Sequence, residues 1–196
     1  MMKIIAMLLG IMVLAHPVPA LAAQPEPATG YIFLGDSRTV GMDKAAGLSD
    51  MDDTFVVAEC GMGFDWMMET GLAEVSRFMD DNPEYENWIL VINLGINDVC
   101  GGAGRYLEAY NKLKDVTVYA VSVNPCNGDY ECLNSYVSAF NSELEASGIH
   151  YIDTCSILMD AGFKTRDGLH YDSRTYRLIF DIIADETGCG KDYEGE

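Results

Sequence analysis

The sequence predicts one α/β domain in which helices cover both faces of a mainly parallel sheet. The chain has 196 residues, which is the length of a single domain. From residue 30 onward, short apolar or β-branched runs alternate with longer amphipathic segments. Parallel strands need long crossover connections, so this alternation is typical of strands joined by helices. Continuous apolar runs also indicate strands that are buried on both faces.

The elements can be placed in order along the chain. Strands are expected at 31–34, 54–58, 88–94, 116–123 and 149–152. Helices are expected at about 37–47, 64–80, 102–114, 131–147 and 172–187. In folds of this type, ligands bind beyond the carboxyl ends of the strands. Polar residues that directly follow a strand are therefore the candidates for chemistry.

Residues 1–23 are expected to be a cleaved signal peptide outside the domain. Lys3 precedes an apolar run at 4–14, and the small residues of 20–23 resemble a cleavage site. A transmembrane anchor is the less favoured alternative, because the run is shorter than the ~20 residues that span a bilayer. We therefore expect secretion, either free or with retention at the cell wall. The linker would be 24–30 and the domain 31–196, with no stable membrane anchor after cleavage.

The chain is strongly acidic, with a formal net charge of −19. A surface of this sign repels phosphate backbones, so nucleic acid is not an expected partner.

The sequence contains six cysteines, at positions 60, 100, 126, 132, 155 and 189. An even number in an exported protein suggests disulfides, and Cys126 with Cys132 is the favoured pair because a turn-rich sequence separates them. No C-x-x-C pair or nearby histidine supports zinc, and we expect neither a metal nor another cofactor.

Ser37 follows the first expected strand in the run Gly35-Asp36-Ser37. At a strand-to-helix turn its hydroxyl would project over the edge of the sheet. Its backbone N–H would lie at a helix start, where N–H groups favour anions. Taken alone, the tripeptide has a structural alternative, in which the serine only caps the helix.

Two further polar turns follow the second and third strands. The second contains Gly61 and Gly63, either of which could direct a backbone N–H at a substrate. The third contains Asn97, whose amide can donate to a developing oxyanion. An ordinary strand–helix turn and an Asx-turn are the structural alternatives.

His170 is the candidate base, three residues after Asp167. This spacing lets the carboxylate accept from one ring nitrogen and leaves the other as a base toward a serine. The other two histidines are weaker candidates for the base. His16 lies in the expected signal peptide. His150 lies in an expected strand, where a structural role is favoured.

Four short blocks follow one another along the chain: Gly-Asp-Ser, a glycine, Gly-x-Asn-Asp and Asp-x-x-His. With these blocks in this order, the sequence resembles the SGNH (GDSL) hydrolase family. The resemblance implies a flavodoxin-like, three-layer α/β/α fold. It also implies that Ser37 is the nucleophile, His170 the general base and then acid, and Asp167 the orienting partner. The implied oxyanion hole consists of the Ser37 N–H, the Gly63 N–H and the Asn97 side chain, with Gly61 as the alternative glycine. Arg38 departs from the family, which usually has leucine after the serine.

This resemblance implies a serine esterase that works through an acyl-enzyme, and the expected signal peptide implies that it is exported. The favoured substrates are short-chain, especially acetyl, esters on a carbohydrate or cell-envelope polymer. The alternatives are a lipase or thioesterase, an acyltransferase that uses the same residues, and a non-catalytic binding module. Apolar residues after the second strand could line an acyl pocket or simply form helix core: Met62, Phe64, Trp66, Met67 and Met68.

Overall fold

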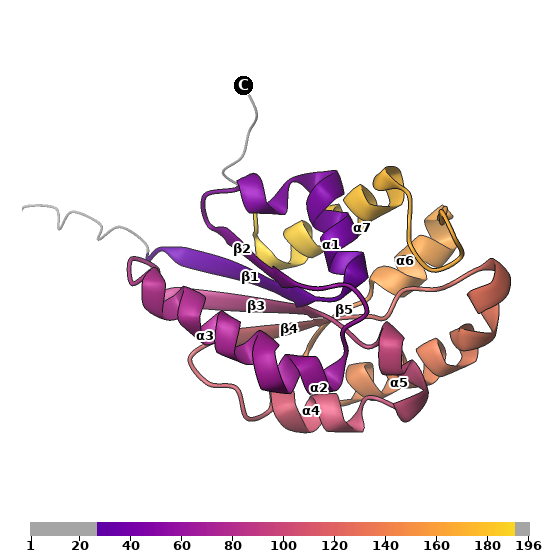
Figure 1. Ribbon diagram of the computed structural model, residues 1–196, viewed down its shortest axis with the longest axis horizontal. Coiled ribbons are helices and arrows are strands. Elements are labelled where there is room, and N and C mark those ends of the chain that lie inside the picture. Colours follow the sequence, from indigo (N-terminus) through magenta and orange to yellow (C-terminus); the bar gives the residue numbers. More distant parts are fainter. Residues whose placement is uncertain (1–26, 191–196) are drawn as a thin grey trace, which may run out of the picture.

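The computed structural model describes residues 27–190, which form a five-stranded parallel sheet between two layers of helices (Figure 1). The strands are β1 (Thr29–Gly35), β2 (Thr54–Ala58), β3 (Asn87–Asn93), β4 (Thr117–Val121) and β5 (His150–Ile152). Their order in the sheet is β2-β1-β3-β4-β5, and every pairing is parallel. This is the flavodoxin-like order, so the predicted fold class is confirmed.

The main helices are α1 (Ser37–Ala46), α2 (Phe64–Trp66), α3 (Leu72–Asp81), α4 (Gly104–Tyr110), α5 (Asn134–Ala146), α6 (Thr154–Ala161) and α7 (Ser173–Thr187). A π-helical turn, Met67–Gly71, joins α2 to α3. Three 3₁₀ turns lie at Leu48–Asp50, Ile96–Gly101 and Gly128–Leu133.

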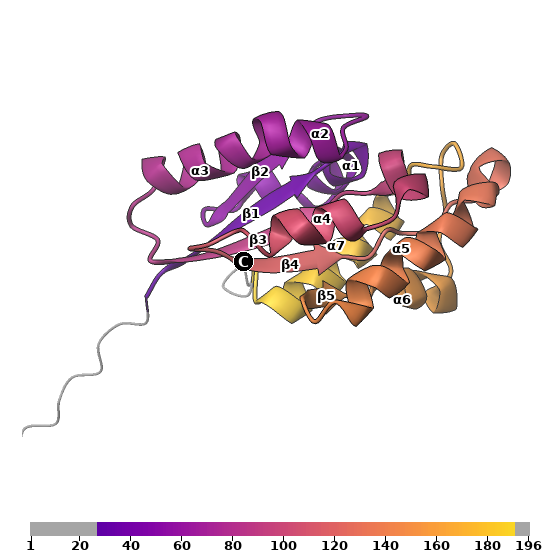
Figure 2. The same ribbon diagram turned by 90° about the horizontal axis from the view of Figure 1, so that it is seen from below.

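The helices form one layer on each face of the sheet. α1 and α7 lie on one face together with α6, while α2, α3, α4 and α5 lie on the other (Figures 1 and 2). Strand β1 shows why both layers are needed, since successive strand residues point to opposite faces. Ile32 and Leu34 pack in one core, whereas Tyr31 and Phe33 pack in the other. A strand in this position must be apolar throughout, as the sequence is.

The predicted strands are confirmed within a few residues, and the differences have local causes. β1 begins at Thr29, inside the expected linker, because the N–H groups of Glu86 and Asn87 both donate to the Ala28 carbonyl. The helix expected at 64–80 is interrupted by the π-helical turn. Helix α6 was not predicted, although the Asp153 side chain caps it by accepting from the Ser156 N–H at 3.0 Å. The expected signal peptide lies outside the described residues.

The expected disulfide between Cys126 and Cys132 is wrong for this structure. All six cysteines are free, and the two thiols have different surroundings. Cys126 is buried and its sulfur accepts from the Arg38 guanidinium, whereas Cys132 is exposed and its sulfur lies 3.9 Å from the Asp129 carbonyl oxygen.

Between residues 27 and 190, no group of three or more His, Cys, Asp or Glu side chains could hold a metal ion. Over the same residues no helix is both long and apolar enough to span a bilayer.

We expect Gly41→Ala to lower the free energy of unfolding by about 1–3 kcal/mol, although alanine favours a helix by ~1 kcal/mol over glycine. An added methyl group would lie 2.5 Å from the Tyr176 ring, where α1 packs on α7. Gly104 is the matched control, because a methyl group at this first residue of α4 would meet nothing within 4 Å. Gly104→Ala should stabilise by about 0.4–1 kcal/mol. Urea denaturation measures both, and an equally stable Gly41→Ala variant would contradict this close packing of the two helices.

Candidate active site

Ser37, His170 and Asp167 form a continuous hydrogen-bonded triad. His170 Nε2 lies 2.9 Å from Ser37 Oγ, and His170 Nδ1 lies 2.7 Å from Asp167 Oδ2. Because a carboxylate can only accept, Nδ1 carries the proton and Nε2 is free to accept from the serine hydroxyl. The structure therefore joins Ser37 and His170, the residues expected to be nucleophile and base, across 133 positions of the chain.

Asp167 is held in its role by the backbone of its own turn. Its Oδ1 accepts from the N–H groups of Leu169 at 2.9 Å and His170 at 2.7 Å, while Oδ2 accepts from the imidazole. The hydrogen bonds from His170 lower the pKa of Asp167 to about 2. The side chain is therefore a carboxylate at neutral pH, although it is more than half exposed.

Ser37 is the first residue of α1, and Asp36 rather than Ser37 caps that helix. Asp36 Oδ1 accepts from the Arg38 N–H at 2.9 Å. The Ser37 hydroxyl therefore does not cap the helix, which was the alternative to a catalytic role. Its backbone N–H lies in the first turn, where a helix offers no internal acceptor.

Asp36 also contacts Asn97, the residue expected in the oxyanion hole. The sequence did not indicate this contact. Asp36 is 1% exposed, and its Oδ2 accepts from the Asn97 amide at 3.2 Å. Burial raises the pKa of Asp36 to about 6, against the lowering effects of the Arg38 N–H and the charges of Arg38 and His170. The carboxyl group thus links the turn that carries Ser37 to the turn that carries Asn97.

Asn97 faces the glycine turn. Its side-chain nitrogen donates to the Met62 carbonyl at 2.8 Å and to Asp36, so both of its N–H groups are engaged. Gly63 lies against Asp98, since an added Cβ would come within 2.7 Å of Asp98 Oδ2. Gly61 needs to be glycine for another reason, its φ of +78°. The structure therefore brings Asn97 to the turn that contains both glycines, through the Met62 carbonyl between them.

Asp98 fixes the start of α2, and the sequence did not indicate this role. Its Oδ2 accepts from the Phe64 N–H at 2.9 Å and from the Arg105 guanidinium, and its Oδ1 accepts from the Tyr106 hydroxyl at 2.7 Å. The guanidinium of Arg105 also lies over the Phe64 ring, 4.6 Å from its centroid. The residue after Asn97 therefore anchors the residue after Gly63.

The chain from Asn124 to Asn127, here called the 124–127 segment, supports the histidine turn. The Asn127 N–H donates to the Gly168 carbonyl at 2.9 Å, and Asn127 Oδ1 accepts from the Thr165 hydroxyl. Gly168 has a φ of +90°, and an added Cβ would lie 2.5 Å from the Asn127 carbonyl oxygen. Glycine within the Asp167–His170 turn is therefore required both by conformation and by space.

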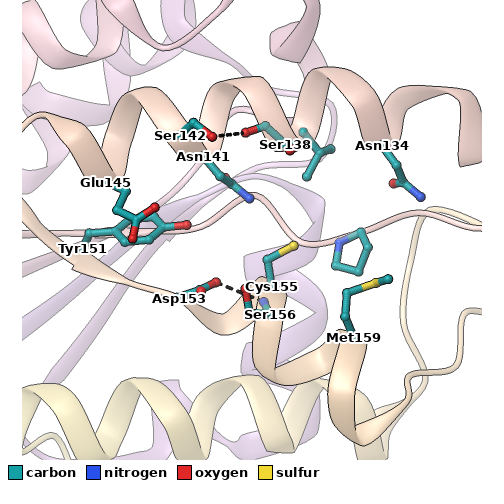
Figure 3. Close-up of a pocket in the computed structure, with 12 residues that line it drawn as sticks. Asn134, Ser138, Asn141, Ser142, Glu145, Tyr151, Asp153, Cys155, Ser156 and Met159 are labelled. Carbon is teal, nitrogen blue, oxygen red and sulfur yellow. Dashed lines mark hydrogen bonds between the residues drawn. The ribbon is translucent and has the colours of Figure 1, made fainter.

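A pocket of about 330 Å³ lies between α5, β5 and α6, away from the triad (Figure 3). Asn134, Asn141, Tyr151 and Cys155 are among its lining residues, whereas Ser37, Asp167 and His170 are not. Burial raises the pKa of Cys155 to about 11, which keeps its sulfur a thiol. Because the thiolate is the reactive form, Cys155 is a poor nucleophile at neutral pH.

The apolar residues after β2 are divided between core and surface. Met67 is fully buried, and Phe64 packs edge-on against Tyr106 with ring centroids 5.1 Å apart. Met68 is 46% exposed on the π-helical turn. Met67 and Phe64 therefore pack as helix core, which was the alternative to lining an acyl pocket.

Comparison with known proteins supports the fold. No protein-family model matches the chain, and no curated protein matches it. Among solved structures, a lipolytic protein of the G-D-S-L family from Veillonella parvula is 16% identical, with a TM-score of 0.65, over 83% of this chain and 100% of that one.

Two other solved structures have the same fold. The C-terminal catalytic domain of Streptococcus pneumoniae peptidoglycan O-acetyltransferase A, solved with a methylsulfonyl adduct, is 18% identical with a TM-score of 0.59, over 85% of this chain and 96% of that one. A family 3 carbohydrate esterase from Clostridium thermocellum is 16% identical with a TM-score of 0.50, over 80% and 94%. The chain therefore has the fold of SGNH (GDSL) hydrolase structures, as the sequence motifs implied.

We expect Asp36→Asn to remove a fall in the free energy of unfolding between about pH 4 and pH 6. The folded-state pKa of Asp36, about 6, lies above its ordinary value of 3.8, so the folded protein binds this proton more tightly than the unfolded chain does. Rising pH therefore penalises folding across that window, and asparagine has no such proton to lose. Denaturant titrations of both proteins at several pH values measure the slope.

Asp172→Asn is the matched control, because Asp172 caps α7 by accepting from the Thr175 N–H at 2.8 Å. That hydrogen bond lowers the pKa of Asp172, so its contribution is present above the ordinary pKa and is lost as the pH falls below it. Asp172→Asn should therefore remove a rise in the free energy of unfolding with increasing pH, a slope opposite in sign to that caused by Asp36. Persistence of the wild-type slope in Asp36→Asn would show that another group causes it.

Proposed function

We propose that this protein is a serine esterase that hydrolyses short-chain acyl esters through an acyl-enzyme. The observation that carries the proposal is the triad, in which a serine at a helix N-terminus lies 2.9 Å from an imidazole oriented by a carboxylate. This is the arrangement of a nucleophile, a base and its orienting partner. The shared fold with a G-D-S-L lipolytic protein and a carbohydrate esterase agrees with it.

In this mechanism Ser37 Oγ attacks the ester carbonyl carbon while His170 Nε2 takes the hydroxyl proton. The tetrahedral intermediate collapses when His170 returns that proton to the leaving alcohol, which breaks the ester bond and leaves an acyl-serine. Water then attacks the acyl group with His170 again as the base, and Ser37 leaves with a proton as the acid is released. Asp167 stays ionised and stabilises the imidazolium that forms in each half.

The proposed oxyanion hole combines the N–H groups of Ser37 and Gly63 with the side chain of Asn97. Because both N–H groups of Asn97 are already engaged, an oxyanion has to replace one of their acceptors. Asp36 is the one we expect to be displaced, since its contact of 3.2 Å is longer than the 2.8 Å contact with the Met62 carbonyl.

We infer that the substrate is a small acyl group, such as acetyl, on a carbohydrate or cell-envelope polymer. Asn97 is exposed and the His170 side chain is 35% exposed, so a bulky alcohol part could approach the triad. Met67 is buried in the core and Phe64 packs on Tyr106, so these two side chains do not form an open pocket for a long acyl chain. Export, expected from residues 1–23, would bring the enzyme to such polymers.

Acyl transfer is the second candidate. The specific observation in its favour is the shared fold with the catalytic domain of a peptidoglycan O-acetyltransferase. Transfer would use the same acyl-serine, with a sugar hydroxyl in place of water in the second half. Measuring how the acyl-enzyme partitions between water and an added oligosaccharide distinguishes the two.

We expect Ser37→Ala to abolish hydrolysis of p-nitrophenyl acetate and to abolish covalent labelling by a fluorophosphonate, because both reactions need the serine oxygen. Intact-mass spectrometry measures the label, and peptide mapping of the wild type should place it on Ser37. The two described histidines provide a matched pair. His170→Gln should reduce kcat by at least ~10³-fold, whereas His150→Gln should not, since His150 stacks on Tyr119 at an exposed site. A folded wild type that neither reacts nor turns over would favour the binding module.

Acyl length is tested with acetyl, butyryl and octanoyl esters of p-nitrophenol. We expect kcat/KM to fall by at least ~10-fold from acetyl to octanoyl, because each buried methylene gains ~0.8 kcal/mol only where an apolar pocket receives it. A preference for octanoyl would instead indicate a lipase or thioesterase.

A further inference from the structure

Arg38, the residue after the nucleophile, is a buried cation whose guanidinium has no hydrogen bond to a carboxylate among residues 27–190. The residue is 3% exposed, and its guanidinium donates to the Asn124 carbonyl at 2.7 Å, the Leu169 carbonyl at 3.1 Å and the Cys126 sulfur at 3.2 Å. Burying a charge in this way costs more free energy than burying an apolar side chain of similar volume. The negative charge of Asp36 and the three hydrogen bonds offset part of this cost, and the hydrogen bonds also fix the groups that accept them.

The bond to Leu169 acts on the peptide unit that carries His170. In this one peptide, the Leu169 carbonyl accepts from Arg38 Nε, and the His170 N–H donates to Asp167 Oδ1 at 2.7 Å. Both polar atoms of the peptide plane are therefore fixed, from opposite sides. Rotation of this plane would move the imidazole, so Arg38 limits the freedom of the base.

The face of the guanidinium acts on the residue after His170. It lies over the Tyr171 ring, 5.0 Å from the centroid, and the Tyr171 hydroxyl donates to the Pro125 carbonyl. Arg38 thus contacts the residues on both sides of His170. Its other two donors attach the same group to the 124–127 segment.

We propose that Arg38 is a positioning residue that fixes the His170 imidazole relative to Ser37. The inference rests on the proposed function, because it takes Ser37 and His170 as the reacting pair. Arg38 adjoins Ser37, and its side chain donates to the Leu169 carbonyl of the peptide before His170. One side chain therefore couples the nucleophile turn to the base turn. Misplacement of a catalytic group by ~1 Å can cost ~10²-fold in rate, which gives such a coupling a measurable effect.

Only an arginine can make this set of contacts. The three acceptors lie around one planar group with donors in fixed directions, and that plane also stacks on an aromatic ring. The single nitrogen of a lysine cannot reach all three acceptors or stack in this way. Arg38→Lys therefore keeps the charge and removes the geometry.

The test compares kcat, KM and the histidine tautomer in wild type and Arg38→Lys. We expect kcat for p-nitrophenyl acetate to fall by at least ~10-fold while KM changes by less than ~2-fold, since the substrate contacts remain. Imidazole ¹⁵N chemical shifts should show a single Nδ1–H tautomer for His170 in the wild type and a mixture in Arg38→Lys. His150→Gln and His170→Gln spectra assign the signals.

Arg177→Lys is the matched control, because Arg177 Nε also donates to a distant carbonyl, that of Ala45 at 2.7 Å, and joins α7 to α1. It should lower stability without changing kcat or the His170 signal. If Arg38→Lys folds and keeps both the wild-type kcat and the wild-type tautomer, the inference is wrong.

Two further outcomes are decided separately. If the wild type itself has no turnover and no fluorophosphonate label, the proposed function fails, and the tautomer comparison alone decides whether Arg38 positions His170. If Arg38→Lys does not fold, Cys126→Ala takes its place, since it removes one anchor and leaves the guanidinium intact. We expect a several-fold fall in kcat from it with the same change in tautomer, and no change in either would overturn the inference.

Discussion

The candidate site depends on the attachment of two distant turns to the 124–127 segment. From one side, Arg38 of the nucleophile turn donates to the Asn124 carbonyl and the Cys126 sulfur. From the other side, the histidine turn is attached through Asn127, whose N–H donates to the Gly168 carbonyl. The segment follows β4, an interior strand that pairs with β3 and β5, so it is anchored to the sheet. The sheet therefore helps to set the separation of Ser37 and His170 through this stretch of chain, together with the direct hydrogen bond from Arg38 to the Leu169 carbonyl.

The fold and the triad could be predicted because they leave local signals in the sequence. The interior strands β1, β3 and β4 are buried along most of their length, so they stand out as apolar or β-branched runs. The edge strands β2 and β5 were recognised as short runs between the expected helices. Ser37 and Asn97 were found because polar residues that follow a strand are placed by topology rather than by packing. His170 was found because it lies three residues after an aspartate, just before the last expected helix. Asp167 was found because a spacing of three residues lets its carboxylate accept from the imidazole within one local turn, a hydrogen bond that the structure contains.

What could not be predicted depends on partners that are far apart in the sequence. Nothing beside Arg38 indicates that its donors end on carbonyls 86 and 131 positions away. The same holds for Asp36, whose contact with Asn97 spans 61 positions, and for the burial that raises its pKa. The Cys126–Cys132 pairing failed for a related reason, since short spacing says nothing about which way a buried sulfur faces. Helix α6 is the exception, because Asp153 is a local capping signal that stands in the sequence beside the helix.

The 133-residue separation of Ser37 and His170 also has a consequence for the time course of folding. Contacts between distant parts of a chain form slowly, because a long loop has to close before they stabilise anything. The nucleophile turn is made from the start of the domain, whereas the base arrives with the turn just before α7, its final helix. A growing or refolding chain therefore holds its serine without a base until its last segment docks. Reactivity at Ser37 would then mark completion of the fold, and its onset would time the docking of the final turn and helix.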